Sequence, residues 1–95
     1  MTMSNEIQAL RDRVSAAFPS AETDLEVFPS SAVMLDVRLK KRLFVLAYYP
    51  GRGFGVDEVL ENEGFNTGYR FVSEDIRLAE QELLRLLRQS NEDQL

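Results

Sequence analysis

Hydrophobic residues recur at a helical spacing near both ends of the chain. Between residues 5 and 18 they fall at offsets of 0, 3, 7, 10 and 11, which puts them in one stripe along a helix: Ile7, Leu10, Val14, Ala17 and Phe18. The same offsets recur between residues 74 and 89: Ile76, Ala79, Leu83, Leu86 and Leu87. The pattern therefore predicts two amphipathic helices, over 5–18 and 74–89, each with one face for a hydrophobic core.

Polar residues mark the ends of both predicted helices. Ser4 and Ser73 are expected to be the N-caps, because a serine side chain accepts hydrogen bonds from the free N–H groups of a first helical turn. Pro19 cannot continue the first helix. Leu78 points away from the apolar stripe of the second helix and has no expected burial partner. Residues 1–4 and 90–95 are expected to fray.

The middle of the chain alternates apolar and polar residues, as strands do. We predict strands over 25–28, 32–39, 42–49 and 53–59, and a short fifth strand over 69–72. Residues 57–64 also fit a short helix, because Asp57 suits a helix start and Gly64 a helix end. We keep the strand to residue 59, followed by a loop over 60–67.

A two-residue loop, Lys40 and Lys41, joins the second and third predicted strands into a hairpin. A loop of this length fixes which residues face each other across the two strands. The expected pairs are Val37 with Phe44, Leu35 with Leu46, and Val33 with Tyr48. These residues form one continuous apolar face.

The other face of the 42–49 strand is apolar as well, which is typical of a central strand. It carries Leu43, Val45, Ala47 and Tyr49, next to Met34 on the neighbouring strand. Either one helix covers each face of the sheet, or a partner protein or a second copy covers this face. The sequence leaves both arrangements open, and we take these five residues as a candidate protein interface.

An acidic segment is the second candidate contact surface. Four carboxylates lie within seven residues: Asp57, Glu58, Glu61 and Glu63. Such a cluster has enough oxygen ligands for Ca²⁺ or Mg²⁺, but the order of residues does not match the calcium-loop pattern. We therefore expect no metal site, and a solvated loop or a patch that attracts a basic partner.

Together these elements predict one α+β domain over residues 1–95. Its sheet is an antiparallel four- to five-stranded meander flanked by N- and C-terminal helices, in the order α-β-β-β-β-(β)-α. A length of 95 residues, with 44% hydrophobic and 28% charged residues, fits one small globular core.

Composition excludes many kinds of active site. The chain has no His and no Cys, so the usual neutral-pH acid/base, the thiolate nucleophile and His- or Cys-based metal sites are absent. No Ser-x-x-Lys or Gly-x-Ser-x-Gly pattern activates a nucleophile. We expect a protein that is not an enzyme and holds no cofactor.

Two further features resemble ligand-binding motifs, but we interpret both as structural. Gly51, Gly53 and Gly55 follow a strand, but a phosphate loop needs a helix start directly after it, and we expect a turn instead. Four basic residues crowd the hairpin tip: Arg38, Lys40, Lys41 and Arg42. The run has no interleaved aromatic residue for base stacking, and the net charge of −5 repels nucleic acid, so nucleic-acid binding is not expected.

Aromatic residues support an alternative function. Seven of the nine lie between residues 44 and 71: Phe44, Tyr48, Tyr49, Phe54, Phe65, Tyr69 and Phe71. Core packing is the default interpretation, but such a cluster, with the glycine-rich turn at 51–55, also fits a small-ligand binding domain.

The order of predicted elements is similar to that of small single-domain bacterial immunity proteins and of secretion-chaperone-like modules. That resemblance implies a protein that works by binding one partner. We therefore expect a small protein-interaction or regulatory module that acts as a homodimer or captures another protein. The longest apolar run, residues 43–49, is far too short for a membrane span, and the N-terminus lacks a signal-peptide pattern, so a cytoplasmic location is expected.

Overall fold

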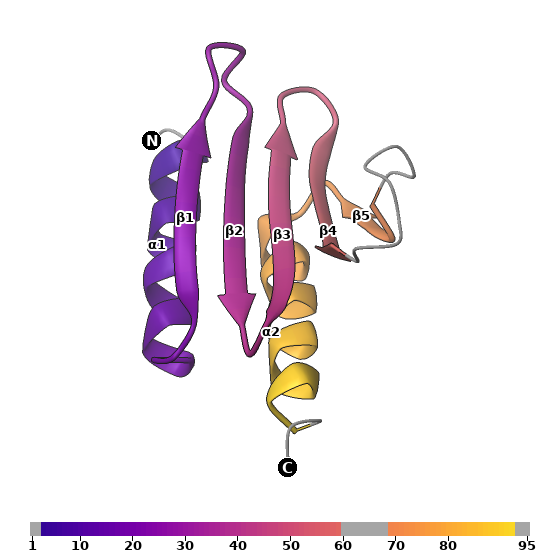
Figure 1. Cartoon of the computed structure of the whole chain (residues 1–95). Helices are drawn as coiled ribbons and strands as arrows, with labels where there is room; N and C mark the ends of the chain where they lie inside the picture. The colour runs from indigo at the N-terminus through magenta and orange to yellow at the C-terminus, as the bar shows by residue number, and fades with distance from the viewer. Residues whose placement is uncertain (1–2, 60–68, 93–95) are drawn as a thin grey trace.

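The computed structural model describes residues 3–59 and 69–92 and places two helices and five strands in them (Figure 1). In chain order the elements are α1 (Met3–Ala17), β1 (Glu22–Val27), β2 (Val33–Leu39), β3 (Arg42–Tyr49), β4 (Gly53–Val59), β5 (Phe71–Ser73) and α2 (Ile76–Glu92). The strands form one antiparallel sheet in the order β1-β2-β3-β4-β5. The predicted α+β meander with a helix at each end is confirmed.

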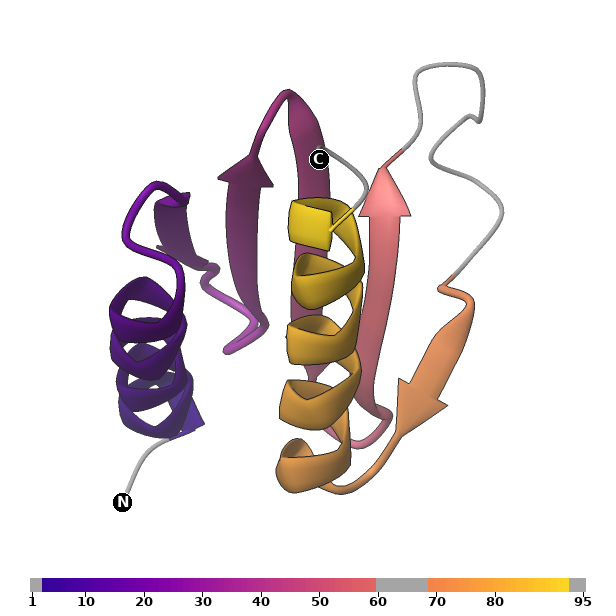
Figure 2. The same ribbon diagram turned by 90° about the horizontal axis from the view of Figure 1, so that it is seen from below.

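Both helices pack on the same face of the sheet. Figure 2 shows α1 and α2 on one side, with α1 against β1 and β2, and α2 mainly against β3, β4 and β5. One core joins the helices to this face, and its largest fully buried hydrophobic side chains are Ile7, Leu10, Val14, Leu35, Val37, Leu39, Phe44, Leu46, Val56, Leu83 and Leu87. The arrangement with one helix on each face is therefore wrong.

The β2–β3 hairpin has the predicted register. All three expected pairs are present: Val37 with Phe44, Leu35 with Leu46, and Val33 with Tyr48. Lys40 and Lys41 turn the chain with φ values of 52° and 70°. Positive φ at both turn residues is the geometry of a type I′ turn, whose twist matches that of the strands it joins.

The observed helix ends differ from the predicted ones. Since α1 begins at Met3, Ser4 lies inside its first turn and is not the N-cap. The second helix begins two residues later than predicted, and Asp75 caps it, because Asp75 Oδ1 accepts a hydrogen bond from the Arg77 N–H at 2.8 Å. Ser73 Oγ instead accepts the Asp75 N–H, at 3.1 Å. Residues 3–4 and 90–92, which were expected to fray, are helical: α1 begins at Met3, and α2 continues to Glu92 with Ser90 fully buried.

The observed strand bounds agree best with the predicted ones in the middle of the sheet. Both β3 and β4 have the predicted bounds. The first strand starts three residues earlier than predicted, so it includes Glu22 and Asp24. The last strand starts two residues later, so Tyr69 and Arg70 lie before it.

A salt bridge connects the two helices. Arg13 on α1 donates from Nε and Nη2 to the two carboxylate oxygens of Glu80 on α2, at 2.8 and 2.7 Å. The two parallel hydrogen bonds fix the orientation of the Arg13 and Glu80 side chains relative to each other. The pair adds little stability, because the Arg13 side chain is 56% exposed. It holds α1 and α2 side by side on one face.

Over residues 3–59 and 69–92, no helix combines the length and the apolar composition needed to cross a bilayer. The cytoplasmic location expected from the sequence stays a prediction.

Candidate functional site

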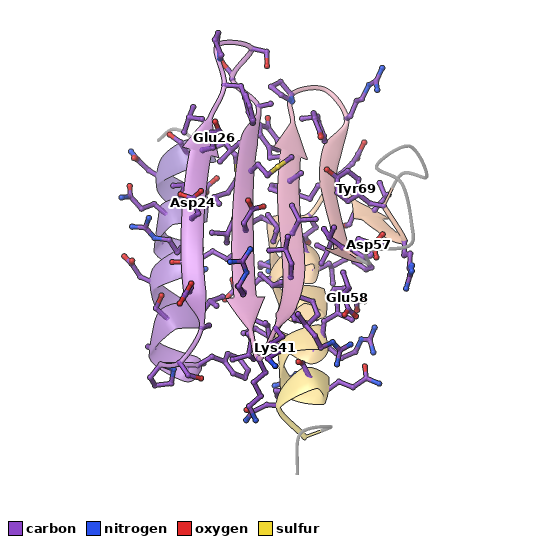
Figure 3. The ribbon with its side chains drawn as sticks, viewed as in Figure 1. Asp24, Glu26, Lys41, Asp57, Glu58 and Tyr69 are labelled. Atoms are coloured by element: carbon purple, nitrogen blue, oxygen red, sulfur yellow. The ribbon has the colours of Figure 1, made fainter. Side chains whose placement is uncertain are left out.

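The candidate site is the sheet face opposite the two helices, which we call the outer face (Figure 3). It consists of every second residue of each strand, because side chains alternate between the two faces of a sheet. The strand register places on it Glu22, Asp24, Glu26, Met34, Asp36, Arg38, Leu43, Val45, Ala47, Tyr49, Asp57, Val59 and Val72.

Most of the interface residues predicted from the sequence share this face. They are Met34, Leu43, Val45, Ala47, Tyr49 and Asp57. Glu58 lies on the helix side instead, because it is directly opposite the core residue Phe44. Glu61 and Glu63 lie outside the described residues.

Glu58 has a partner within the chain. Arg42 donates from Nε and Nη2 to its two carboxylate oxygens, at 2.7 and 2.6 Å, and the Arg42 guanidinium lies 5.5 Å from the centre of the Phe44 ring. The basic hairpin tip and the acidic segment thus meet inside one molecule. Lys40 and Lys41 remain exposed at the tip.

The chain itself covers part of the apolar row on β3. Val45 is 6% exposed and Ala47 only 1% exposed, although no described helix lies over them. Tyr69 packs over Gly55, the direct neighbour of Ala47: a Cβ on Gly55 would lie 2.5 Å from the Tyr69 ring. The burial of Val45 and Ala47 therefore does not require a partner, and Tyr49, 37% exposed, is the more accessible end of the row.

Two tyrosines link β3 to the segment before β5. The hydroxyl oxygens of Tyr49 and Tyr69 are 3.1 Å apart, and their ring centres 6.3 Å. Burial raises the pKa of Tyr69, and the hydrogen bond to Tyr49 and the nearby charges of Asp36 and Asp57 raise it further. Tyr69 therefore stays protonated at neutral pH.

Carboxylates gather on the part of the outer face formed by β1 and β2. Asp24 is directly opposite Asp36, and Glu26 is opposite Met34. Burial raises the pKa of Asp36, and the negative charges of Asp24 and Glu26 raise it further. The positive charge of Arg38 lowers this pKa, but by less. Like charges directly opposite each other destabilise a sheet.

We call Glu22, Asp24, Glu26 and Asp36 the acidic half of the outer face. Among the described residues, none of the four lies within ion-pair distance of a basic side chain. On the other half, Asp57 is neutralised, because its Oδ1 lies 3.4 Å from Arg70 Nε. The outer face is thus negative along β1 and β2, and close to neutral along β3 to β5.

The sequence also singled out the glycine-rich turn and the clustered carboxylates. Gly51 in the β3–β4 turn and Gly53 at the start of β4 have φ values of 82° and 95°, and the turn leads into a strand, not a helix. Over 3–59 and 69–92, no three acidic side chains are grouped so as to hold a metal ion.

The aromatic residues are mostly core residues. Phe44 and Phe54 are buried, and the Tyr48 ring packs against Phe54 with 5.1 Å between centres. Phe65 lies outside the described residues. An open groove of about 390 Å³ lies on the helix side, where only Phe71 of the described aromatics contributes, beside Leu78, Gln81, Glu82, Arg85 and Arg88.

Comparisons with protein-family models, with curated proteins and with solved structures found no match to this chain.

Neither the acidic half nor the position of Tyr69 was predicted from the sequence. The signal for the first was present, since Glu22, Asp24 and Glu26 occupy alternate positions, as residues on one face of a strand do. The packing of Tyr69 over Gly55 joins residues fourteen apart. No local pattern indicates such a contact.

Proposed function

We propose that this chain is a small protein-interaction module that binds a basic partner protein through its outer face. The observation that carries the proposal is the position of Asp24 directly opposite Asp36, on a face that neither helix covers. Lysine or arginine side chains of a partner would remove the repulsion between these two carboxylates. Electrostatic complementarity of this kind gives an interface its specificity and raises its association rate.

Apolar residues next to the acidic half supply the contact area. Met34 is partly exposed beside Glu26, and Tyr49 is 37% exposed at the same end of β3. Tyrosine and methionine are enriched in protein interfaces, because they bury a large area and adapt to a partner. A partner with basic residues around an apolar centre fits this surface.

We propose a binding role and not a catalytic one. The described ionisable side chains on the outer face are carboxylates, Arg38 and Tyr49, with Tyr69 and Arg70 beside them, and the raised pKa of Tyr69 makes it a poor general base. A second copy of the chain is the weaker candidate partner. Each copy has a net charge of −5 and brings the same acidic half to the interface.

Affinity capture with matched variants tests the proposal. The bait is the wild-type chain, the variant Asp24→Lys/Glu26→Lys, or the control Asp12→Lys/Glu74→Lys, which makes the same change in net charge at exposed positions outside the acidic half. We expect wild type and control to retain a basic protein that the outer-face variant loses. Once purified, that protein should bind wild type with an affinity that falls as salt is added.

Two results would contradict the proposal. In the first, the outer-face variant retains every protein that the wild type retains. In the second, light scattering shows that the wild-type chain is a dimer that Asp24→Lys/Glu26→Lys dissociates. The second copy would then occupy the outer face in place of a basic partner.

A further inference from the structure

The first strand of the sheet has an open edge. Among the described residues β1 pairs only with β2, so its other side is an edge of the sheet. Within 3–59 and 69–92, the N–H and C=O groups on that side have no strand to pair with. An exposed strand edge of this kind is a template for one more strand, which is a recurring way for proteins to bind extended peptides. With six residues, β1 is twice as long as β5 at the other edge.

The side chains along this edge alternate in chemistry. Glu22, Asp24 and Glu26 lie on the outer face and are exposed. Thr23, Leu25 and Val27 lie on the helix side, where Val27 is 55% exposed. An added strand would place its own side chains about 5 Å from these, with the same alternation between faces.

A second copy of β1 is a poor occupant of this edge. Two copies related by a two-fold axis would pair β1 with β1 in the antiparallel direction. Among the registers that keep the apolar residues on the helix side, those with the longest overlap of β1 put acidic residues of the two copies opposite each other: Glu22 opposite Glu26 and Asp24 opposite Asp24, or Asp24 opposite Glu26. Like charges in directly opposed positions destabilise such a pairing, so the edge repels itself.

We propose that the open edge of β1 receives an extended basic segment of the partner as a sixth strand. In this segment lysine or arginine alternates with apolar residues. The basic side chains lie beside Glu22, Asp24 and Glu26, and the apolar ones lie beside Leu25 and Val27 on the helix side. This inference rests on the proposed function, because it specifies how a basic partner approaches the acidic half.

A variant of the chain itself provides a preformed basic strand as the probe. The substitutions Glu22→Lys, Asp24→Lys and Glu26→Lys turn β1 into a strand whose outer-face residues are complementary to wild-type β1. Mixed with this variant, the wild-type chain should form a heterodimer with twice the mass of one 10.9 kDa chain in light scattering. Each protein by itself should remain a monomer, and added salt should weaken the heterodimer.

Hydrogen exchange identifies the edge as the contact. In a mixture with isotopically labelled wild type, the β1 amides that point away from β2 should exchange more slowly than in wild type by itself, because they donate to the new strand. The control is the variant Gln8→Lys/Asp12→Lys/Glu74→Lys/Gln89→Lys, which adds the same charge at exposed positions outside β1. It should form no heterodimer and slow no β1 amide.

The outcomes separate this inference from the proposed function. A mixture that stays monomeric, or a control that associates equally well, overturns strand addition. A heterodimer with unchanged exchange along β1 also overturns it, but leaves binding through the outer face intact. The three substituted residues are exposed, so the variant should fold, as circular dichroism can check. The double variant Asp24→Lys/Glu26→Lys gives the same comparison if the triple variant does not fold.

Discussion

Asp24 and Asp36 lie directly opposite each other on neighbouring antiparallel strands, with both side chains on the outer face of the sheet. No basic side chain in the described part of the chain forms an ion pair with either of them. The free chain therefore keeps a repulsion that a conservative substitution would remove. In the proposed complex, the positive charges of a basic partner relieve this repulsion.

The first prediction concerns this repulsion. Asp36→Asn should raise the free energy of unfolding at neutral pH by about 0.2–1 kcal/mol, the size of a cross-strand pair interaction. Because the pKa of Asp36 is raised in the folded chain, ionisation of this group costs stability as the pH rises through that pKa. Below 3.8, the ordinary pKa of the group, Asp36 is protonated in both states, and the gain should disappear.

Urea titrations of both proteins at neutral and at acid pH measure this difference. Asp12→Asn, on the exposed side of α1, serves as the control and should change stability little at either pH. An equal gain for Asp36→Asn at both pH values would show that charge is not the cause.

The second prediction concerns the facing of α2. Leu83→Ala should lower the free energy of unfolding by about 2–5 kcal/mol, because Leu83 is fully buried in the core. Leu78→Ala should cost much less, because Leu78 is 47% exposed beside the open groove. Denaturant titrations of the two variants test this contrast, and equal losses would be inconsistent with the observed facing of the helix.

The third prediction concerns the cap of α2. Asp75→Ala should destabilise the fold, because the Asp75 side chain accepts the Arg77 N–H at the start of the helix. The Arg77 guanidinium and this backbone N–H lower the pKa of Asp75, so its contribution is present above pH 3.8 and is lost as the pH falls through the lowered pKa. The stability difference between wild type and variant should therefore shrink in acid, and a constant difference would exclude the capping carboxylate as its source.

The fourth prediction uses two glycines of the β3–β4 turn. Gly51 and Gly53 both have positive φ, and an alanine at either position is strained. A Cβ on Gly53 would also lie 2.7 Å from the backbone oxygen of Ser73, whereas nothing lies within 4 Å of a Cβ on Gly51. Gly53→Ala should therefore lower the melting temperature more than Gly51→Ala does, and the reverse order would contradict the close approach of Gly53 to Ser73.

The β2–β3 hairpin is the part of the fold that the local sequence pattern predicts best. The two-residue loop at Lys40 and Lys41 determines which residues of β2 and β3 face each other, and alternation then assigns each side chain to a face. For this reason the residues of the outer face on β2 and β3 were predictable from the sequence.

The position of the helices was not predictable in the same way. The apolar stripe of a helix shows which side faces the core, but it does not show which face of the sheet that core occupies. The choice depends on packing between elements far apart in the chain, such as Leu10 of α1 and Leu83 of α2, which share one core. The outer face is uncovered because α1 and α2 both pack on the opposite face.

The acidic half was not predicted, because it also depends on contacts between separate elements. The pairing of Asp24 with Asp36 requires that β1 extend back to Glu22, and the alternation that identified this strand begins only at Leu25. Glu22 and Asp24 are of types depleted in strands, so residues 22–24 give a weak strand signal despite Thr23, and pairing with β2 overrides it. The local sequence therefore shows the acidic residues but not their opposition.

The most direct test of the account is to map a purified partner onto the chain by NMR. Titrating the basic protein retained by the wild-type chain into isotopically labelled chain should give the largest amide shifts in β1, β2 and β3, with Asp24 and Asp36 among them. The exposed side of α2 should change little. If the largest shifts instead surround Leu78 and Arg85, the partner binds the groove on the helix side, and the outer face is not the binding surface.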